Sequence, residues 1–207
     1  MLNLLTEQLR GRTDLSSEQV IDAVEQMTSE EILPEVKAEF LTALAAKGES
    51  TEELAAFAGE LRARATTVPL DDATRAGTIL DVCGTGGDGL NTFNISTTVS
   101  ILCAAAGVTV AKHGNRAITS RSGSADVLAA LGIPTDLSPA AAAASMAAHD
   151  FAFLFAPLYH PAFKNIAPAR KLCAEAGKRT LFNFLGPLLN PARPTAQLIG
   201  VPRAELT

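Results

Sequence analysis

The sequence predicts an α/β protein with a small helical domain at its N-terminus. Apolar residues recur at helical spacing up to about residue 64, and the polar stretch "TTVPLDDATRAG" then breaks this pattern. After it, short apolar runs alternate with helical stretches, which is typical of parallel strands joined by crossover helices. We therefore expect an all-helical domain at 1–66 and a larger α/β domain with a mainly parallel sheet at 74–207.

Two capping boxes predict helix starts in the first domain. Ser16 is followed three residues later by Gln19, and Ser50 by Glu53, so each pair can satisfy two free N–H groups. Pro34 favours another start, because proline is tolerated at the first position of a helix. These helices carry no obvious chemistry, and we interpret them as a packing or dimerisation domain.

The second domain contains four predicted strands: "TILDVC", "VTVAKH", "FAFLFAP" and "QLIGV". Helices are predicted at roughly 97–106, 123–131, 139–149 and 161–176. Parallel sheets place ligand sites in the loops beyond the carboxyl ends of their strands. The loops after the first three strands are unusually polar or rich in glycine, so the sequence predicts a site at that edge of the sheet.

Composition argues against several classes of function. The 207 residues include 17 Lys and Arg against 22 Asp and Glu, a net charge of −5, whereas nucleic-acid-binding proteins usually carry a basic excess. Cys83, Cys103 and Cys173 form no CxxC pair, which argues against a disulfide framework or a zinc site. We find no signal-peptide pattern and no apolar run long enough for a membrane span, and we expect a cytoplasmic protein.

The loop after the first strand predicts an anion site. Four glycines lie within six residues: Gly84, Gly86, Gly87 and Gly89. Their N–H groups can converge on one point, and side-chain donors follow at a predicted helix N-terminus. The spacing fits neither the P-loop nor the dinucleotide fingerprint, and a tight turn alone would need only one or two glycines. We interpret the loop as a phosphate or pyrophosphate cradle.

The loop after the second strand adds cations and hydroxyl groups. They are Lys112, Arg116, Arg121, Ser120, Ser122 and Ser124. Because both loops follow strands of one parallel sheet, they suit a ligand with several phosphate oxygens. His113, His149 and His160 show no metal-ligand spacing. For His113 and His160, a structural hydrogen bond and proton transfer both stay open.

Five motifs in order resemble those of the anthranilate phosphoribosyltransferase family: "GTGGD", "NIST", "KHGNRAITSRSGSADVLAALG", "FLFAPLYHPA" and "RTLFNFLGPLLNP". The resemblance covers essentially the whole chain and implies a fold of the nucleoside phosphorylase and phosphoribosyltransferase type. It implies transfer of the phosphoribosyl group from 5-phosphoribosyl 1-diphosphate to anthranilate, with release of pyrophosphate, in tryptophan biosynthesis. It also implies Mg²⁺ and a homodimer formed through the helical domain, with neither nucleic acid nor membrane as a partner.

The resemblance further implies a role for individual residues. Phosphoribosyl diphosphate is expected at Gly84, Gly87, Asp88, Thr92, Asn94, Ile95, Ser96, Thr97, Lys112, His113, Gly114, Asn115, Arg116, Ala117, Ile118, Thr119, Ser120 and Ser124. Anthranilate is expected at Gly84, Asn115 and Arg170, and one magnesium ion at Ser96. No catalytic base is assigned, because the aromatic amine of anthranilate is already neutral at pH 7. Positioning and electrostatic stabilisation are expected to supply the rate.

Members of this family continue beyond the position that matches residue 207, and the resemblance places an Asp-Glu pair for a second magnesium ion in that portion. We therefore expect a truncated or partial chain, with the α/β domain incomplete at the C-terminus. A pyrimidine nucleoside phosphorylase and a non-catalytic nucleic-acid-binding relative share the fold and stay open as alternatives. A fragment that folds but has no function of its own is a third.

Overall fold

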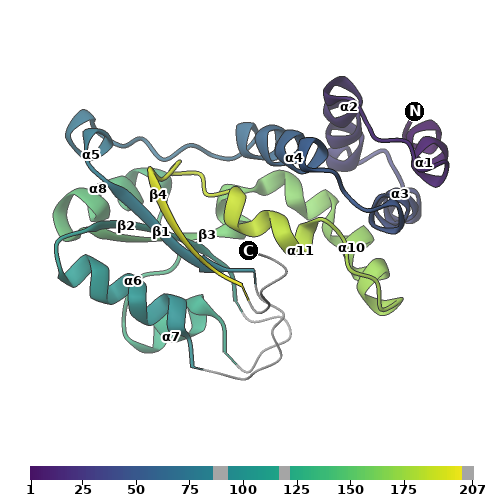
Figure 1. Ribbon diagram of the computed structural model, residues 1–207. Coiled ribbons are helices and arrows are strands. Elements are labelled where there is room, and N and C mark those ends of the chain that lie inside the picture. The colour runs from purple at the N-terminus through teal and green to yellow at the C-terminus, as the bar shows by residue number, and fades with distance from the viewer. Residues whose placement is uncertain (86–92, 117–121, 202–207) are drawn as a thin grey trace. The chain divides into compact units, whose positions relative to one another are not determined.

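A computed structural model describes residues 1–85, 93–116 and 122–201 of the chain (Figure 1). The chain divides into two compact units. The first, the helical unit, contains residues 1–64 and 161–189; the second, the sheet unit, contains residues 65–160 and the chain from residue 190 onward. Within the described residues, no helix is both long enough and apolar enough to cross a membrane.

The helical unit begins with α1 (Leu2–Arg10), α2 (Ser17–Thr28), α3 (Pro34–Lys47) and α4 (Thr51–Ala63). Both predicted capping boxes are confirmed. The Ser16 hydroxyl accepts from the Gln19 N–H at 3.3 Å and the Ser50 hydroxyl from the Glu53 N–H at 3.2 Å. The Gln19 and Glu53 side chains accept in return from the cap N–H groups. Each cap is worth about 1 kcal/mol of helix stability.

Four elements from later in the chain complete the helical unit. Two are short 3-10 helices, η1 (Pro161–Asn165) and η2 (Gly186–Leu188), and two are α-helices, α10 (Ala167–Glu175) and α11 (Phe182–Leu185). Ile166, Cys173 and Leu185 are buried in one hydrophobic core with residues of α1 to α4. The helical domain expected at 1–66 did not include this segment. Its packing depends on residues more than a hundred positions away, which local sequence patterns do not reveal.

The prediction of one continuous helix at 161–176 is wrong, because the structure has two separate helices there with a break at Ile166. η1 ends at Asn165, and α10 begins one residue after Ile166. Pro168 is the physical reason. In a continuous helix its ring would clash with the carbonyl of Lys164, four residues earlier, whereas proline is tolerated within a first helical turn.

The sheet unit contains β1 (Ile79–Gly84), β2 (Thr109–Gly114), β3 (Phe151–Phe155) and β4 (Ala196–Gly200). These described strands form one sheet in the order β3-β2-β1-β4, and every neighbouring pair is parallel. The predicted parallel sheet is therefore confirmed. β1 and β2 occupy its centre, so the two loops predicted to bind phosphate follow neighbouring strands.

Helices cover both faces of this sheet (Figure 1). They are α6 (Ile95–Ala105) and α7 (Ser124–Ala130) on one face and α8 (Pro139–His149) on the other, with the short α5 (Asp72–Ala76) and α9 (Ala156–Tyr159) in the connections. Phe153 packs against Leu128 of α7, whereas Leu154 packs with Met146 of α8. Successive β3 residues thus enter different cores, as expected for a strand buried on both faces.

Candidate functional site

The carboxyl ends of the four described strands lie together and form one edge, here called the carboxyl edge. Gly84 is the register partner of Gly200, and Gly114 of Phe155. The N–H of Thr85 continues the pairing by donating to Gly200 O at 3.1 Å. The loops after β1 and β2 therefore leave the sheet at the same edge, as the sequence predicts.

The predicted donor-binding residues are only partly described. Gly87, Asp88, Thr92 and residues 117–120 lie outside the described residues. The remaining ones lie where β1 and β2 end and where α6 and α7 begin: Gly84, Asn94, Ile95, Ser96, Thr97, Lys112, His113, Gly114, Asn115, Arg116 and Ser124. The site can therefore be described at its strand ends and helix starts.

The N-terminus of α6 is tied to the loop after β2. Asn94 immediately precedes the helix, and its Nδ2 donates to Ser122 O at 3.3 Å. Ser96 lies in the first turn and is partly buried, while Thr97 is buried. First-turn N–H groups have no acceptor within their helix, and the helix dipole favours negative charge there. This end of α6 can therefore receive an anion.

Gly114 is required at the end of β2 by close packing. A Cβ atom at this position would lie 2.8 Å from Cε2 of Phe153 and 3.5 Å from Cβ of Ser124. Phe153 is fully buried, so its ring has little room to yield. The glycine allows the β2 end, β3 and the start of α7 to approach one another closely.

The loop after β2 holds its arginine with several contacts. Arg116 Nη1 lies 3.7 Å from Asp126 Oδ1, and its guanidinium lies over the Phe155 ring, 5.8 Å from the centroid. The Arg116 N–H donates to Asn115 Oδ1 at 2.8 Å, and Asn115 O accepts from the Ala125 N–H at 3.4 Å. Both side chains are exposed, so they are accessible to a ligand at the carboxyl edge.

Lys112 lies elsewhere than the predicted phosphate contact suggests. It is 1% exposed, and its Nζ donates to Val82 O at 2.7 Å. Burial lowers the pKa of this lysine, and the nearby Asp81 carboxylate opposes that shift. In this structure the ammonium group thus joins β2 to β1 inside the sheet unit instead of standing in the loop.

Asp81 is a fully buried acid in the middle of β1. Its Oδ2 accepts from Gln197 Nε2 at 3.2 Å and its Oδ1 from the His113 N–H at 3.4 Å. Burial raises the pKa of this carboxyl, and hydrogen bonds together with the charge of Lys112 partly offset the shift. Asp81 therefore joins three strands of the sheet below the carboxyl edge.

The structure pairs two histidines that the sequence analysis treated separately. The rings of His113, at the end of β2, and His160, after β3 and α9, have centroids 5.1 Å apart and are inclined by 58°. His160 is buried. Their positions, one at the end of a strand and one shortly after the neighbouring strand, were the sequence signal for this pairing. Within the described residues, no group of three His, Cys, Asp or Glu side chains could hold a metal ion.

Arg170 belongs to the helical unit, on α10. Its guanidinium lies over the Phe182 ring, 5.1 Å from the centroid. Burial lowers the pKa of this arginine. Among residues 1–85, 93–116 and 122–201, no side-chain hydrogen bond or ion pair engages the guanidinium. Its N–H donors are therefore available to an anionic ligand.

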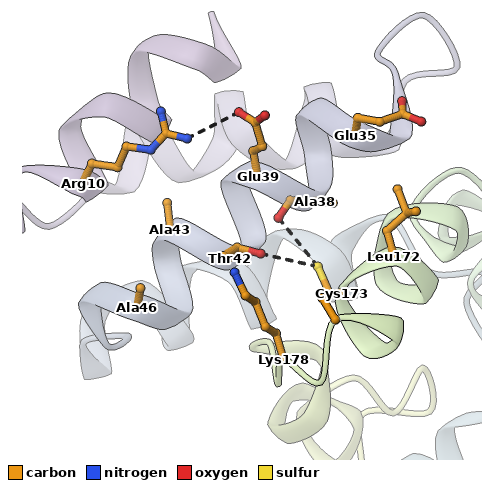
Figure 2. Close-up of a pocket in the computed structure, with 11 residues that line it drawn as sticks. Arg10, Glu35, Ala38, Glu39, Thr42, Ala43, Ala46, Leu172, Cys173 and Lys178 are labelled. Carbon is orange, nitrogen blue, oxygen red and sulfur yellow. Dashed lines mark hydrogen bonds and ion pairs between the residues drawn. The ribbon is translucent and has the colours of Figure 1, made fainter.

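A cavity of about 500 Å³ lies in the helical unit between α3 and α10, bordered by Arg10 of α1 (Figure 2). Small α3 side chains such as Ala38 and Thr42 face Leu172 and Cys173 of α10. The cavity contains none of the residues predicted for donor or acceptor binding. Its rim carries charges of both signs, which does not select one class of ligand.

Comparisons with known proteins match both parts of the chain. Residues 3–65 match the glycosyl transferase family helical bundle domain, and residues 76–207 match the glycosyl transferase family a/b domain. The observed helices of the first unit and the helix-covered sheet of the second agree with a helical bundle domain and an a/b domain.

Individual relatives are anthranilate phosphoribosyltransferases, and they confirm the resemblance drawn from the motifs. The enzyme of Herpetosiphon aurantiacus is 48% identical over 95% of this chain and 56% of its own length. A crystal structure from Thermus thermophilus has a TM-score of 0.86 at 39% identity, covering 97% of this chain and 59% of that one. A Saccharomyces cerevisiae structure in complex with PRPP and Mg has a TM-score of 0.85 at 30% identity, covering 99% and 59%. The chain thus spans a little over half the length of these relatives.

Proposed function

Because the chain belongs to the glycosyl transferase family, whose helical-bundle and a/b domains it contains, we propose that its protein is an anthranilate phosphoribosyltransferase. It transfers the phosphoribosyl group of 5-phosphoribosyl 1-diphosphate to anthranilate and releases pyrophosphate, a step of tryptophan biosynthesis. One observation carries the proposal. The two loops that the sequence predicts for phosphate leave neighbouring strands at one edge and are joined by the bond from Asn94 Nδ2 to Ser122 O.

The carboxyl edge is the proposed donor site. The N-terminus of α6 offers the N–H groups of Ser96 and Thr97 and the Ser96 hydroxyl, and Asn115 and Arg116 supply exposed donors at the end of β2. Negative charge builds on the departing pyrophosphate, and donors fixed in advance stabilise it more effectively than mobile water does. Lys112 is assigned a different role, since its ammonium group is buried against Val82 O.

Arg170 is the proposed acceptor residue. Anthranilate carries a carboxylate next to its amine, and a guanidinium can bind a carboxylate through two parallel hydrogen bonds. The side chain meets this need because its donors are unused within the described residues. The Saccharomyces cerevisiae structure in complex with PRPP and Mg supports the donor, while the choice of anthranilate as acceptor rests on the activity of the relatives and on Arg170.

The proposed reaction needs no strong base. The amine nitrogen forms a bond to the anomeric carbon while the bond from that carbon to the diphosphate oxygen breaks. The electron pair leaves with pyrophosphate, and the nitrogen then loses a proton to solvent. Holding the two reactants in line accounts for much of the rate, because it replaces a bimolecular encounter by a reaction within one complex.

Magnesium fits this site as a partner of the diphosphate. Within the described residues, the predicted site offers Ser96 as its hydroxyl ligand and no cluster of acids. This donor set suits Mg²⁺, which usually keeps several waters and is bound through substrate phosphates. When bound, the ion neutralises charge on the leaving group. A homodimer through the helical unit and a cytoplasmic location are further parts of the proposal that rest on the family resemblance.

The test is loss of anthranilate fluorescence on addition of 5-phosphoribosyl 1-diphosphate and Mg²⁺. Because the chain spans 56% of its Herpetosiphon relative, the assay uses both the chain and a fusion that continues with the remainder of that relative. We expect turnover by the fusion that stops when Mg²⁺ is chelated. No turnover, together with phosphate-dependent cleavage of a pyrimidine nucleoside, would replace the proposal by the phosphorylase alternative.

A further inference from the structure

The guanidinium of Arg170 lies over the ring of Phe182. The ring centroid lies 5.1 Å from the guanidinium carbon, within the range of a cation–π contact. Phe182 in turn meets Phe163 edge to face, with centroids 5.6 Å apart and planes inclined by 79°. Both rings pack against the core of the helical unit. The arginine therefore rests on an aromatic support that is itself anchored in the core.

Hydrogen bonds fix the chain on either side of this support. Lys37 is 2% exposed and its Nζ donates to Asn165 O at 2.8 Å and to Ser29 O at 2.7 Å. Asn165 Nδ2 donates to Thr28 O at 2.7 Å, so the last residue of η1 is held from two directions. On the Phe182 side, Asn183 Oδ1 accepts from the N–H of buried Thr180 at 2.9 Å.

The ring contact restrains the guanidinium without neutralising its charge. A cation–π contact involves no oxygen acceptor, so the guanidinium keeps both its charge and N–H donors for an anion. A carboxylate partner would restrain the side chain equally well, but it would neutralise the charge and occupy the donors. No such partner engages Arg170 within the described residues. The arrangement keeps the charge available and limits the directions from which an anion can reach it.

We propose that Phe182 is a positioning residue that holds Arg170 ready for a carboxylate ligand, with Phe163 fixing the angle of the Phe182 ring. The inference rests on the proposed function for the identity of that ligand, anthranilate. Phe182 acts through Arg170 and touches no reacting atom. Its loss should reduce carboxylate binding while leaving the helical unit folded.

The experiment compares Phe182→Leu, Phe182→Tyr and the matched control Phe57→Leu, which removes an aromatic ring from the same core. The first readout is the pair of KM values in the fusion described above. We expect Phe182→Leu to raise the KM for anthranilate about five- to tenfold and to leave the KM for 5-phosphoribosyl 1-diphosphate within about twofold. Phe182→Tyr should stay near the wild type, because it retains the ring, and Phe57→Leu should change neither KM.

The second readout does not depend on the reaction. The N–H resonances of the Arg170 side chain are followed by NMR in the 207-residue chain during titration with benzoate. Benzoate should shift these resonances in the wild type and in Phe182→Tyr, and about fivefold more of it should be needed in Phe182→Leu. Equal affinity in the wild type and Phe182→Leu, or no benzoate shift in the wild type, would overturn the inference. If the benzoate titrations gave the expected results but the fusion did not consume anthranilate, the positioning role of Phe182 would be supported and the proposed function would be overturned.

Discussion

The two units differ in whether their candidate cations already have a polar partner. At the carboxyl edge, Lys112 donates to Val82 O and Arg116 faces Asp126, so both cations already have partners. In the helical unit, Arg170 has an aromatic ring beneath it and no acceptor within the described residues. A partnered cation must exchange a contact before it can bind an anion, whereas an unpartnered one requires no exchange. Arg170 should therefore contribute more to affinity than either cation of the sheet unit.

The largest expected effect is that of Arg170→Ala. A charge-assisted hydrogen bond is worth about 1.5–3 kcal/mol, so the KM for anthranilate should rise by about one to two powers of ten. The KM for 5-phosphoribosyl 1-diphosphate should change much less. Arg62→Ala on the exposed surface of α4 is the control. Equal changes in both KM values would show that Arg170 does not act on anthranilate selectively.

Gly114→Ala tests the packing that supports the carboxyl edge. Its Cβ would meet the buried Phe153 ring at 2.8 Å, so the free energy of unfolding should fall by about 1–3 kcal/mol. Urea denaturation followed by circular dichroism measures this. Gly59→Ala is the control, because its Cβ meets nothing within 4 Å in the middle of α4, and it should stabilise by about 0.5–1 kcal/mol. An unchanged unfolding midpoint for Gly114→Ala would show that the Phe153 ring can move away from the added Cβ at little cost in stability.

Asp81→Asn tests the buried acid beneath the edge. Because burial raises the pKa of Asp81 above its usual 3.8, its contribution to stability is present below pH 3.8 and is lost as pH rises through the raised pKa. The unfolding free energy of the wild type should therefore fall relative to that of Asp81→Asn as pH rises from about 4. Urea midpoints of both proteins measured at intervals up to about pH 7 provide the check. Parallel curves would mean that hydrogen bonds and Lys112 cancel the effect of burial.

The smallest expected effect is that of Asp126→Asn, which frees Arg116 from a partly exposed ion pair. Such pairs are worth about 0–1 kcal/mol, so affinity for pyrophosphate should rise by at most about fivefold. Calorimetry at low salt is the measurement, and the gain should shrink as salt is added. Asp136→Asn gives a comparison of equal charge. A weaker affinity would indicate that Asp126 is needed mainly for its bond from the Gly123 N–H.

Local features of the fold were predictable from the sequence, and contacts across the chain were not. The Ser16 and Ser50 caps depend on residues three positions apart, and the strands coincide with short apolar runs. Both features can therefore be predicted from short stretches of sequence. The bond between Lys37 and Asn165 spans 128 positions and leaves no local pattern. Local patterns also do not show that segment 161–189 packs with residues 1–64, because the two pieces meet only in the folded core.

The candidate site shows the same division. The glycines and hydroxyls after β1 and β2 predicted an edge where two loops meet, and the strand order confirms it. Residue type alone could not separate Arg116, which is exposed in its loop, from Lys112, which is buried between strands. The ring contact that holds Arg170 joins α10 to α11 across a turn, and the sequence spacing of Arg170 and Phe182 does not predict it.

The helical unit is assembled from two pieces of chain, 1–64 and 161–189, with most of the sheet unit encoded between them. On the ribosome, Lys37 is therefore made 128 residues before its partner Asn165. At typical synthesis rates of about 5–20 residues per second, that separation corresponds to roughly 6–26 s. For most of this interval α1 to α4 have been synthesised without the helices that complete their core. Apolar surface that α10 and α11 later cover stays uncovered on the nascent chain during this time, so the first helices are open to chaperone binding until residues 161–189 have been synthesised.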